Sequence, residues 1–256
     1  MAEHLARLAP SPSARVSVEV GAEIVALGID IGFSGVRAAV VRGDGTVLGR
    51  ARSGIGHGRR MSVGRAEQDP EALIASISDA TRRATIQADT TDVAVIGIGA
   101  FGCAPLLVDE HLVAISPALL PGLDRRGEAQ RRRLVATTGV DDAQIATDHA
   151  LPKLLWWREV QPALFERAAM AIDVTGFIVA RLTGTAAMDE ITALDYQLAG
   201  VDVPIALPKP CDPLDQVAGL TSEAADATGL PEGTPVTAGT YDSYVDLFAG
   251  ASPEPG

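Results

Sequence analysis

The sequence predicts an α/β fold in which a mixed sheet begins with an antiparallel meander and carries helices on both faces. Three short apolar runs separated by glycines come first, and a long amphipathic stretch and a fourth apolar run follow them. Short apolar runs between turn residues are typical of buried strands, whereas apolar residues at every third or fourth position are typical of a helix. With 256 residues, 47% of them hydrophobic, the chain is long enough for one large domain or two small ones.

Ordered structure is expected from Glu23 onward. Residues 1–22 lack the continuous apolar core of a signal peptide and are predicted to be a disordered extension. The sequence Gly-Asp-Gly at 43–45 is a hairpin signal within the meander. The Gly- and Arg-rich stretch 53–65 is predicted to be a loop. The meander strands are predicted at 24–30, at 36–41 and from 47 onward.

The stretch 69–88 predicts the long helix. Asp69 suits the N-cap and Pro70 suits the first helical position. One face of this helix is apolar and consists of Leu73, Ile77, Ala80 and Ala84. The other predicted elements are strands at 92–98, 106–108 and 235–238, helices at 124–138, 152–159, 174–182 and 220–229, a helix that starts at 243, and a surface excursion at 199–213.

Composition excludes several classes of function. The net charge of −12 argues against a nucleic-acid partner, because an acidic surface repels a polyanion. No run of about twenty apolar residues is present, so no membrane span is predicted. Two cysteines are too few for a disulfide framework or for a zinc site of their own, which is typical of a cytoplasmic protein. The basic run 131–133 is interpreted as a solvated helix face beside Glu128.

The sequence Gly-Ile-Gly-Ala-Phe-Gly at 97–102 matches the glycine pattern of dinucleotide-binding proteins. That pattern requires a helix immediately afterwards, because the N-terminus of the helix binds the pyrophosphate. Pro105 and the extended-looking residues 106–109 follow here instead. We therefore expect no helix after Gly102 and no nicotinamide cofactor.

Two turns that each contain an acid are separated by about two hundred residues. Asp30 ends a buried strand and is followed by a turn with two glycines. The backbone amides of such a turn can approach a phosphate closely, and the carboxylate can hold Mg²⁺ through water. A plain β-hairpin explains this turn equally well. Asp242 follows a strand and Gly239, and it can be either a helix N-cap or a general base aimed into a cleft. For that segment alone the N-cap is the simpler interpretation.

Seven segments follow one another in a characteristic order. They are Asp30-Ile31-Gly32 with Ser34 and Arg37, Glu67-Gln68-Asp69-Pro70, the stretch 96–109, the stretch 119–126, Pro152-Lys153-Leu154-Leu155-Trp156, Arg181-Leu182-Thr183-Gly184, and the stretch 238–242. Together they resemble the FGGY carbohydrate kinases of the sugar kinase/Hsp70/actin superfamily. The resemblance implies a ribonuclease-H-like (actin-like ATPase) domain. It also implies that residues 23–256 form the N-terminal, sugar-binding domain, and that the nucleotide-binding C-terminal domain is absent from this chain.

The resemblance implies ATP-dependent phosphorylation of a small carbohydrate, either a pentulose, a hexose or a polyol, with ATP and Mg²⁺ as cofactors. Asp242 would be the general base that takes the proton of the attacking hydroxyl, and Asp30 would hold the metal ion. Both acids are therefore expected to face one cleft. The implied contacts of the terminal phosphate are Gly32, Ser34 and Arg37, and the implied substrate contacts are Gly102, Cys103, Asp124 and Arg126.

Three features depart from the family pattern. Phe33 stands where the family usually has a threonine in the phosphate loop, so a hydroxyl that could bond a phosphate is replaced by a ring. Phe101 and Cys103 stand where relatives that act on xylulose tend to have Gln and His, so the pocket is less polar and no sugar identity carries over. The chain ends at Gly256, where the family places a second domain.

The leading function is therefore a carbohydrate kinase in which this chain alone is inactive. The alternative is a catalytically silent sugar-binding or scaffolding module derived from such a kinase. The expected partners are a small sugar or polyol and either a second copy of the chain or a chain that supplies the second domain. Trp156 and Trp157 are interpreted as core residues, Asp189 and Asp195 as solvated or capping, and Tyr241 as either a pocket or a packing residue.

Overall fold

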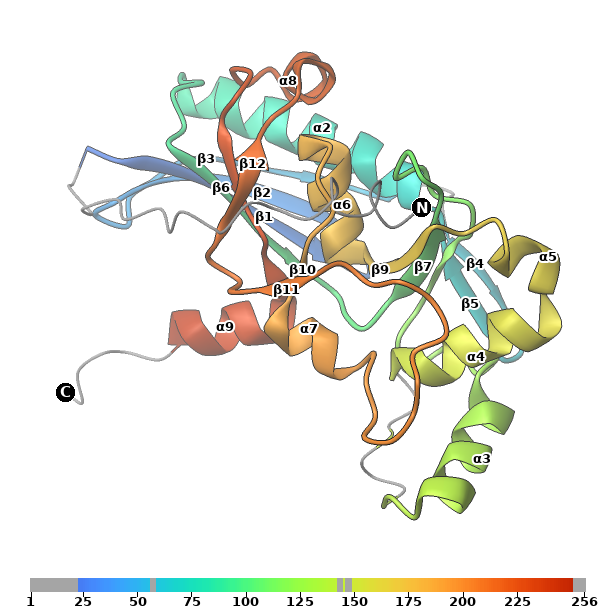
Figure 1. Ribbon diagram of the computed structural model, residues 1–256. Helices are drawn as coiled ribbons and strands as arrows, with labels where there is room; N and C mark the ends of the chain where they lie inside the picture. The colour runs from blue at the N-terminus through green and yellow to red at the C-terminus, as the bar shows by residue number, and fades with distance from the viewer. Residues whose placement is uncertain (1–22, 56–58, 142–144, 146–148, 251–256) are drawn as a thin grey trace.

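The computed structural model describes residues 23–55, 59–141, 145 and 149–250, and the predicted extension at 1–22 lies outside them. Within these residues the main sheet has seven strands in the order β12-β13-β6-β1-β2-β3, with β14 paired to β6 (Figure 1). The strands β1 and β2, and then β2 and β3, pair antiparallel, whereas β6 is parallel to β1. The predicted mixed sheet with an initial antiparallel meander is confirmed. Its strands are β1 (Val25–Gly32), β2 (Gly35–Arg42), β3 (Val47–Ser53), β6 (Val95–Ala100), β12 (Gln216–Gly219), β13 (Pro235–Thr237) and β14 (Thr240–Tyr241).

The long helix α2 (Pro70–Ala88) packs on one face of the sheet, as the sequence predicts. Asp69 caps it by accepting a hydrogen bond from the Glu71 amide at 3.0 Å. Gly49 of β3 permits a close approach, because a Cβ there would lie only 2.3 Å from the carbonyl oxygen of Ala84. The predicted apolar face is fully buried and consists of Leu73, Ile77, Ala80 and Ala84.

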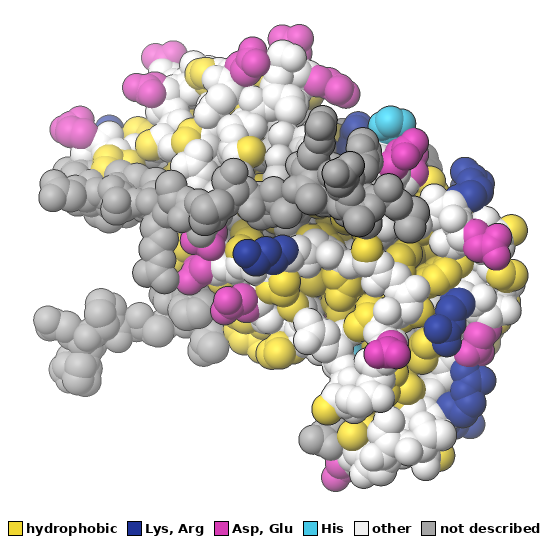
Figure 2. Space-filling view, viewed as in Figure 1, with side chains coloured by type: hydrophobic (Ala, Val, Ile, Leu, Met, Phe, Trp, Pro, Cys, Tyr) yellow, Lys and Arg dark blue, Asp and Glu magenta, His cyan; other side chains and the backbone are white. Residues whose placement is uncertain are grey.

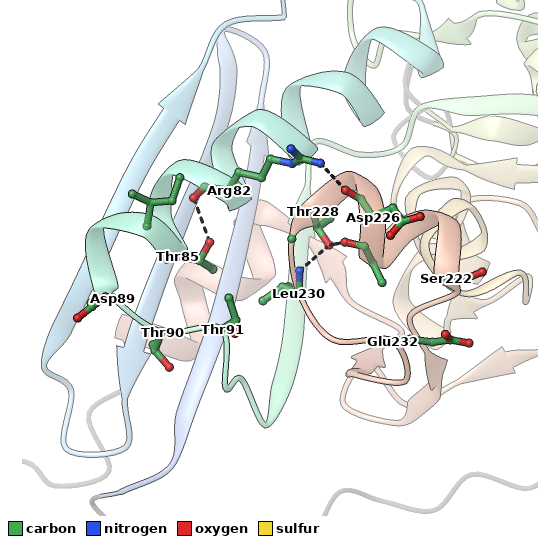
Figure 3. Close-up of a pocket in the computed structure, with 13 residues that line it drawn as sticks. Arg82, Thr85, Asp89, Thr90, Thr91, Ser222, Asp226, Thr228, Leu230 and Glu232 are labelled. Atoms are coloured by element: carbon green, nitrogen blue, oxygen red, sulfur yellow. Dashed lines mark hydrogen bonds between the residues drawn. The ribbon is translucent and has the colours of Figure 1, made fainter.

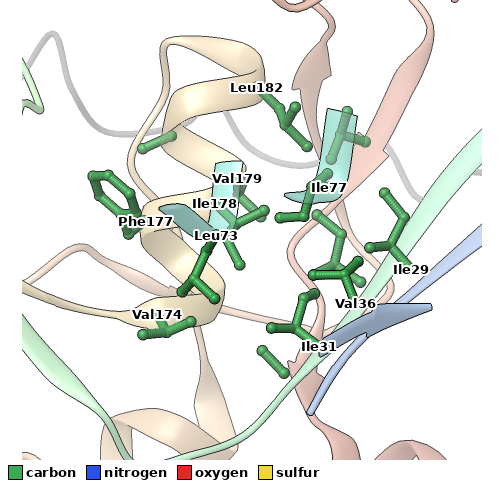
Figure 4. Packing of buried hydrophobic residues seen from close by; sticks show 14 of the residues in the cluster. Ile29, Ile31, Val36, Leu73, Ile77, Val174, Phe177, Ile178, Val179 and Leu182 are labelled. Carbon is green, nitrogen blue, oxygen red and sulfur yellow. The ribbon is translucent and has the colours of Figure 1, made fainter. Parts of the chain in front are cut away.

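Two further helices, α6 (Val174–Thr183) and α8 (Ser222–Thr228), lie on the same side of the sheet as α2 (Figure 1). The main hydrophobic core fills the space between these helices and the inward side chains of β1, β2 and β6. Figure 4 shows side chains from α6 packed opposite those of α2 and of the first two strands. The labelled members of this cluster are Ile29, Ile31, Val36, Leu73, Ile77, Val174, Phe177, Ile178, Val179 and Leu182.

The opposite face of the sheet carries α9 (Asp242–Gly250), with α7 (Glu190–Leu194) beside it (Figure 1). Gly99 of β6 lets α9 approach, because a Cβ on this glycine would lie 3.1 Å from a methyl group of Val245. The prediction of helices on both faces is therefore confirmed. Among the described helices, none combines the length and the apolar character that crossing a membrane requires.

A second apolar cluster lies at the other end of the molecule. Trp156 and Trp157 are only 7% and 1% exposed within it, so their interpretation as core residues is confirmed. Around this cluster, β4 and β8 pair with β5, β7 pairs with β9, and β10 pairs with β11. The elements are β4 (Arg59–Ser62), β5 (Arg65–Gln68), β7 (Pro105–Val108), β8 (Ala118–Leu119), α3 (Glu128–Thr138), α4 (Ala150–Val160), α5 (Pro162–Phe165), β9 (Met170–Asp173), β10 (Met188–Asp189) and β11 (Pro210–Cys211).

Three sequence predictions need correction. The stretch 53–65 is not one loop, because its second half begins the β4–β5 hairpin, which is held in place by pairing with β8. The helix predicted from 124 begins at Glu128, since Asp124 is engaged in a buried ion pair described below. The strands β9 and β12 and the helix α7 have no counterpart in the prediction, because runs of four or five residues carry too little periodicity to be recognised.

The basic run 131–133 lies on α3, on the side of the molecule where Figure 2 shows a row of basic side chains. Arg131 and Arg132 pair with Glu128 at 3.0 and 2.9 Å, and Arg133 pairs with Glu159 of α4. Arg132 and Arg133 are more than half exposed, as a solvated face requires, but Arg131 is only 14% exposed. The two pairs with Glu128 lie within α3, whereas the pair of Arg133 with Glu159 ties α3 to α4.

Candidate functional site

A cavity of about 970 Å³ lies on the face of the main sheet that carries α7 and α9. Its floor has almost no side chains, because glycines on this face of β1 and β6 alternate with the residues that point into the hydrophobic core. A Cβ at Gly28 or at Gly97 would meet no atom within 4 Å. The glycines are register partners on neighbouring strands, and Ala39 of β2 lies opposite Gly28 on the other side. The centre of the sheet is thus open to a ligand that needs close approach to the backbone.

Two acids line this cavity from segments that are far apart in the sequence. Asp30 lies in β1, and Asp242 begins α9. Partial burial raises the pKa of Asp242, a hydrogen bond from the Ser243 amide opposes that shift, and the negative charges of Asp30 and Asp246 add to it. Asp30 and Asp242 thus line the same cavity although they are about two hundred residues apart in the sequence. The expectation that both acids face one cleft is confirmed.

A row of charged side chains crosses the meander next to Asp30. Asp30 on β1 lies opposite Arg37 on β2, and Arg37 lies opposite Arg52 on β3, so all three point to the same face. The guanidinium of Arg37 pairs with the Asp30 carboxylate. Arg52 Nη2 donates a hydrogen bond to Ser34 Oγ at 2.9 Å. Arg52 was not among the residues predicted from sequence, and it adds a second cation at the turn that holds Gly32.

Phe33 at the tip of that turn stacks on Phe101, with ring centroids 5.0 Å apart and planes 15° apart. Phe101 is 1% exposed, whereas Phe33 is 40% exposed. Two of the departures from the family pattern are therefore in contact with each other. The ring that replaces a threonine has an aromatic partner, which explains how a large apolar side chain is accommodated at the tip of a polar turn.

Gly102 and Cys103 lie beneath Tyr241 and outside the cavity lining. A Cβ on Gly102 would fall 1.8 Å from two ring carbons of Tyr241, so the ring rests directly on the glycine. Cys103 is 2% exposed, and burial raises the pKa of its thiol. The turn is fastened by Asp173, whose Oδ1 accepts from the Ala104 amide at 2.7 Å. Burial raises the pKa of Asp173 to about 7.

Asp124 and Arg126 also lie outside the cavity lining, in a buried network. Arg126 donates to Asp124 Oδ2 at 2.7 Å and pairs with Glu67 of β5 at 2.7 Å. Its guanidinium lies over the ring of Trp156, 5.0 Å from the centroid. Asp124 Oδ2 further accepts from the Ala66 amide at 2.9 Å. These contacts hold the loop before α3 against β5 and α4, and substrate contact by this pair stays a prediction.

A second hollow, of about 1000 Å³, lies between the C-terminal half of α2 and α8 (Figure 3). Arg82 of α2 crosses it and donates to the carbonyl oxygens of Asp226 and Ala227. These are carbonyl groups of the last turn of α8, so the arginine stabilises the end of that helix. Asp89 lines this hollow from the end of α2, and Asp226 and Glu232 line it from α8 and the segment that follows, but it has no glycine-lined sheet as its floor, and we explain it by helix packing.

Gly102 is followed by two residues and then by the strand β7, and not by a helix. The glycine pattern at 97–102 therefore lacks the helix N-terminus that binds a pyrophosphate. The expectation of no helix at this point is confirmed, and the motif supports no nicotinamide site.

Structural comparison places the fold among sugar kinases. The chain superposes on xylulose kinase from Rhodospirillum rubrum with a TM-score of 0.77 at 24% identity, covering 91% of this chain and 52% of that one. Gluconate kinase from Lactobacillus acidophilus gives a TM-score of 0.74 at 18% identity, with 86% and 48% covered. At these identities the likeness establishes the fold alone. The mixed sheet with its helices on both faces is thus the actin-like ATPase fold of sugar kinases.

The family model for the N-terminal domain of the FGGY family of carbohydrate kinases matches residues 25–249. The chain therefore belongs to this family. It is 28% identical to L-fuculokinase from Escherichia coli K12 over 253 residues, which is 89% of this chain and 52% of the relative. Xylulose kinase from Klebsiella pneumoniae is 25% identical over 80% of this chain and 46% of its own length. The chain thus spans about half the length of the curated relatives that it matches.

Proposed function

We propose that this chain is the acceptor-binding half of an enzyme that transfers the terminal phosphoryl group of ATP to a hydroxyl of a small sugar or polyol. The observation that carries the proposal is the pair of acids, Asp30 and Asp242, on one cavity above a glycine floor. Phosphoryl transfer needs a base near the attacking oxygen and positive charge near the phosphates, within reach of the same phosphorus. The cavity offers both.

Asp242 is proposed as the general base. Its carboxylate takes the proton of the acceptor hydroxyl while that oxygen forms a bond to the terminal phosphorus and the bond to the ADP oxygen breaks. Burial raises the pKa of Asp242, which makes its carboxylate a stronger base than an ordinary aspartate.

The residues around Asp30 fit a nucleotide phosphate with magnesium. Mg²⁺ in such sites takes one or two carboxylates and fills its shell with phosphate oxygens and water, and Asp30 supplies one half-exposed carboxylate. Arg37 and Arg52 supply positive charge on the same face, and Gly28 leaves room for close approach. When bound, the metal ion neutralises charge on the phosphates. Asp30 is paired with Arg37 in the free chain, so the arginine is expected to turn from the acid to the phosphate when nucleotide binds.

Residues 23–256 are proposed as the sugar-binding domain, with the nucleotide-binding domain contributed by a further segment or by another chain. A second domain that closes over the cavity would exclude water from the phosphates. In water the charges of Asp30, Arg37 and Arg52 are screened, and their effect on the transition state is small. Turnover is therefore expected only when both halves are present.

The test is ATP turnover by a protein with both halves, measured against a panel of pentuloses, hexoses and polyols. A thermal-shift screen of the same panel on the 256-residue chain reports acceptor binding separately, since a ligand of the folded state raises its stability. Sugar-dependent ADP release supports the kinase. Sugar binding without ADP release at any acceptor would favour the silent sugar-binding module instead, and neither binding nor turnover would remove both proposals.

A further inference from the structure

We propose that the short helix α7 positions the base, because acids at its two ends hold the two residues that precede Asp242. These acids are Asp189 and Asp195, and they bind the hydroxyl groups of Thr240 and Tyr241. The inference rests on the proposed function, since it takes Asp242 to be the base. Asp189, Asp195 and Tyr241 are not part of the cavity lining, and the hydroxyl of Thr240, which lines the cavity, is bonded to Asp189, so the role of all four is positioning.

Thr240 is held at the N-terminal end of α7. Its Oγ1 donates a hydrogen bond to Asp189 Oδ1 at 3.0 Å. The same carboxylate oxygen accepts from the amides of Ile191 and Thr192, both at 3.1 Å, and so forms the N-cap of α7. Asp189 is 2% exposed and Thr240 is 4% exposed, so water does not compete for these bonds. Asp189 is thus shared between the helix start and the strand that leads to the base.

Tyr241 is held at the C-terminal end of α7. Its phenol donates to Asp195 Oδ2 at 2.9 Å, and its ring lies on Gly102. The carbonyl oxygen of Asp195 accepts from the amide of Ala150 at 2.8 Å, which ties this point to the start of α4. Tyr241 therefore connects α7, α4 and the predicted substrate turn to the residue next to the base. Because Tyr241 is 7% exposed, its role is packing and positioning.

The backbone fixes the same segment from the other side. Thr240 and Tyr241 form β14, which pairs with β6 at Gly99 and Ala100. Backbone pairing on one side and two side-chain hydrogen bonds on the other leave the following residue little freedom. Asp242 is thereby kept partly buried at the cavity, where burial and nearby acids raise its pKa. The charged groups that line the cavity with it are Asp30, Arg37, Glu190, Asp212 and Asp246.

The test uses two variants that each remove one hydroxyl, Tyr241→Phe and Thr240→Val. The matched control is Tyr244→Phe, which removes a phenol from α9 with its ring only 6.3 Å from Tyr241 and 38% exposed. Circular dichroism establishes that each variant is folded, and if one of them does not fold, the other carries the test. Two quantities are measured: kcat and KM of a protein with both halves, and the pKa of Asp242 from the ¹³C shift of its carboxyl group in the 256-residue chain.

We expect each test variant to lower kcat roughly 10- to 100-fold, the effect of a displacement of about 1 Å at a reacting group, while the sugar KM changes less than about threefold. The pKa of Asp242 should fall toward its ordinary value as the carboxyl group becomes more hydrated, and Tyr244→Phe should change neither quantity. An unchanged kcat and an unchanged Asp242 titration in both test variants would overturn the positioning role. If the wild-type protein turns over no acceptor, the proposed function fails, and the Asp242 titration alone decides whether α7 positions this carboxylate.

Discussion

Replacement of Gly102 by alanine tests the packing of the substrate turn. The new Cβ would fall 1.8 Å from two ring carbons of Tyr241, which is less than half of an ordinary carbon–carbon contact of about 4 Å. The ring must therefore move by roughly 2 Å, and the 2.9 Å hydrogen bond to Asp195 breaks with it. Overpacking costs about 1–3 kcal/mol and a lost hydrogen bond to a charged group about 1.5–3 kcal/mol, so we expect a loss of about 2.5–6 kcal/mol in the free energy of unfolding.

Urea unfolding of the 256-residue chain measures this loss, followed by the fluorescence of Trp156 and Trp157, which belong to the same apolar cluster as Tyr241. The matched control is Gly97→Ala, because a Cβ there would meet no atom within 4 Å. That variant should unfold within about 1 kcal/mol of the wild type. If Gly102→Ala also stays within about 1 kcal/mol, the ring does not rest on the glycine and the reasoning is wrong.

Three further predictions concern the cavity in a protein with both halves. Arg52→Gln should raise the KM for ATP about tenfold, which corresponds to about 1.4 kcal/mol, and the increase should be smaller in high salt. The control is Arg50→Gln, on the same face of β3, which should change this KM little. Equal effects of the two variants would refute a specific contact between Arg52 and a phosphate. Protonated Asp242 cannot accept a proton and its pKa is raised, so kcat plotted against pH should decline on the acid side with a midpoint above pH 3.8. Asp246→Asn removes a neighbouring negative charge and should move this midpoint to lower pH. A midpoint that does not move contradicts the assignment of Asp242 as the base. Phe33→Thr should lower the KM for ATP several-fold, because it restores a hydroxyl that can bond a phosphate. The same change should lower the free energy of unfolding by about 0.5–1.5 kcal/mol, because the stack on Phe101 is lost. An unchanged KM would show that residue 33 does not contact the phosphate.

Periodic features of the fold could be predicted from the sequence. The meander was predictable because its strands are short apolar runs between turn residues, and α2 because its apolar residues recur at the period of a helix. The hairpin β4–β5 was not, because it is held by pairing with β8, which is about fifty residues away in the chain. Short elements of this kind depend on tertiary contacts that leave no periodic signal.

The candidate site was predictable only in part. Asp30, Arg37 and Asp242 line one cavity, whereas Gly32 and Ser34, which were expected at the same phosphate, are not part of its lining. Arg52 could not be predicted, since the β2–β3 pairing shifts by one residue at a bulge beside Val41, and a shift of one residue reverses the face of every later side chain. Burial of Arg126 against Glu67 and Trp156 was equally hard to predict, because these two partners lie in two distant segments of the sequence.

The most direct test of the kinase proposal is the steady-state kinetics of Asp242→Asn in a protein with both halves, compared with Asp246→Asn one turn further along α9. Loss of a general base should lower kcat by about 10²–10⁴, while sugar affinity in a binding assay changes little and Asp246→Asn stays within about threefold of the wild type at neutral pH. If Asp242 only capped the helix, asparagine would replace it almost equally well. Activity of Asp242→Asn close to that of the wild type would therefore contradict the central claim that this carboxylate takes the proton of the acceptor.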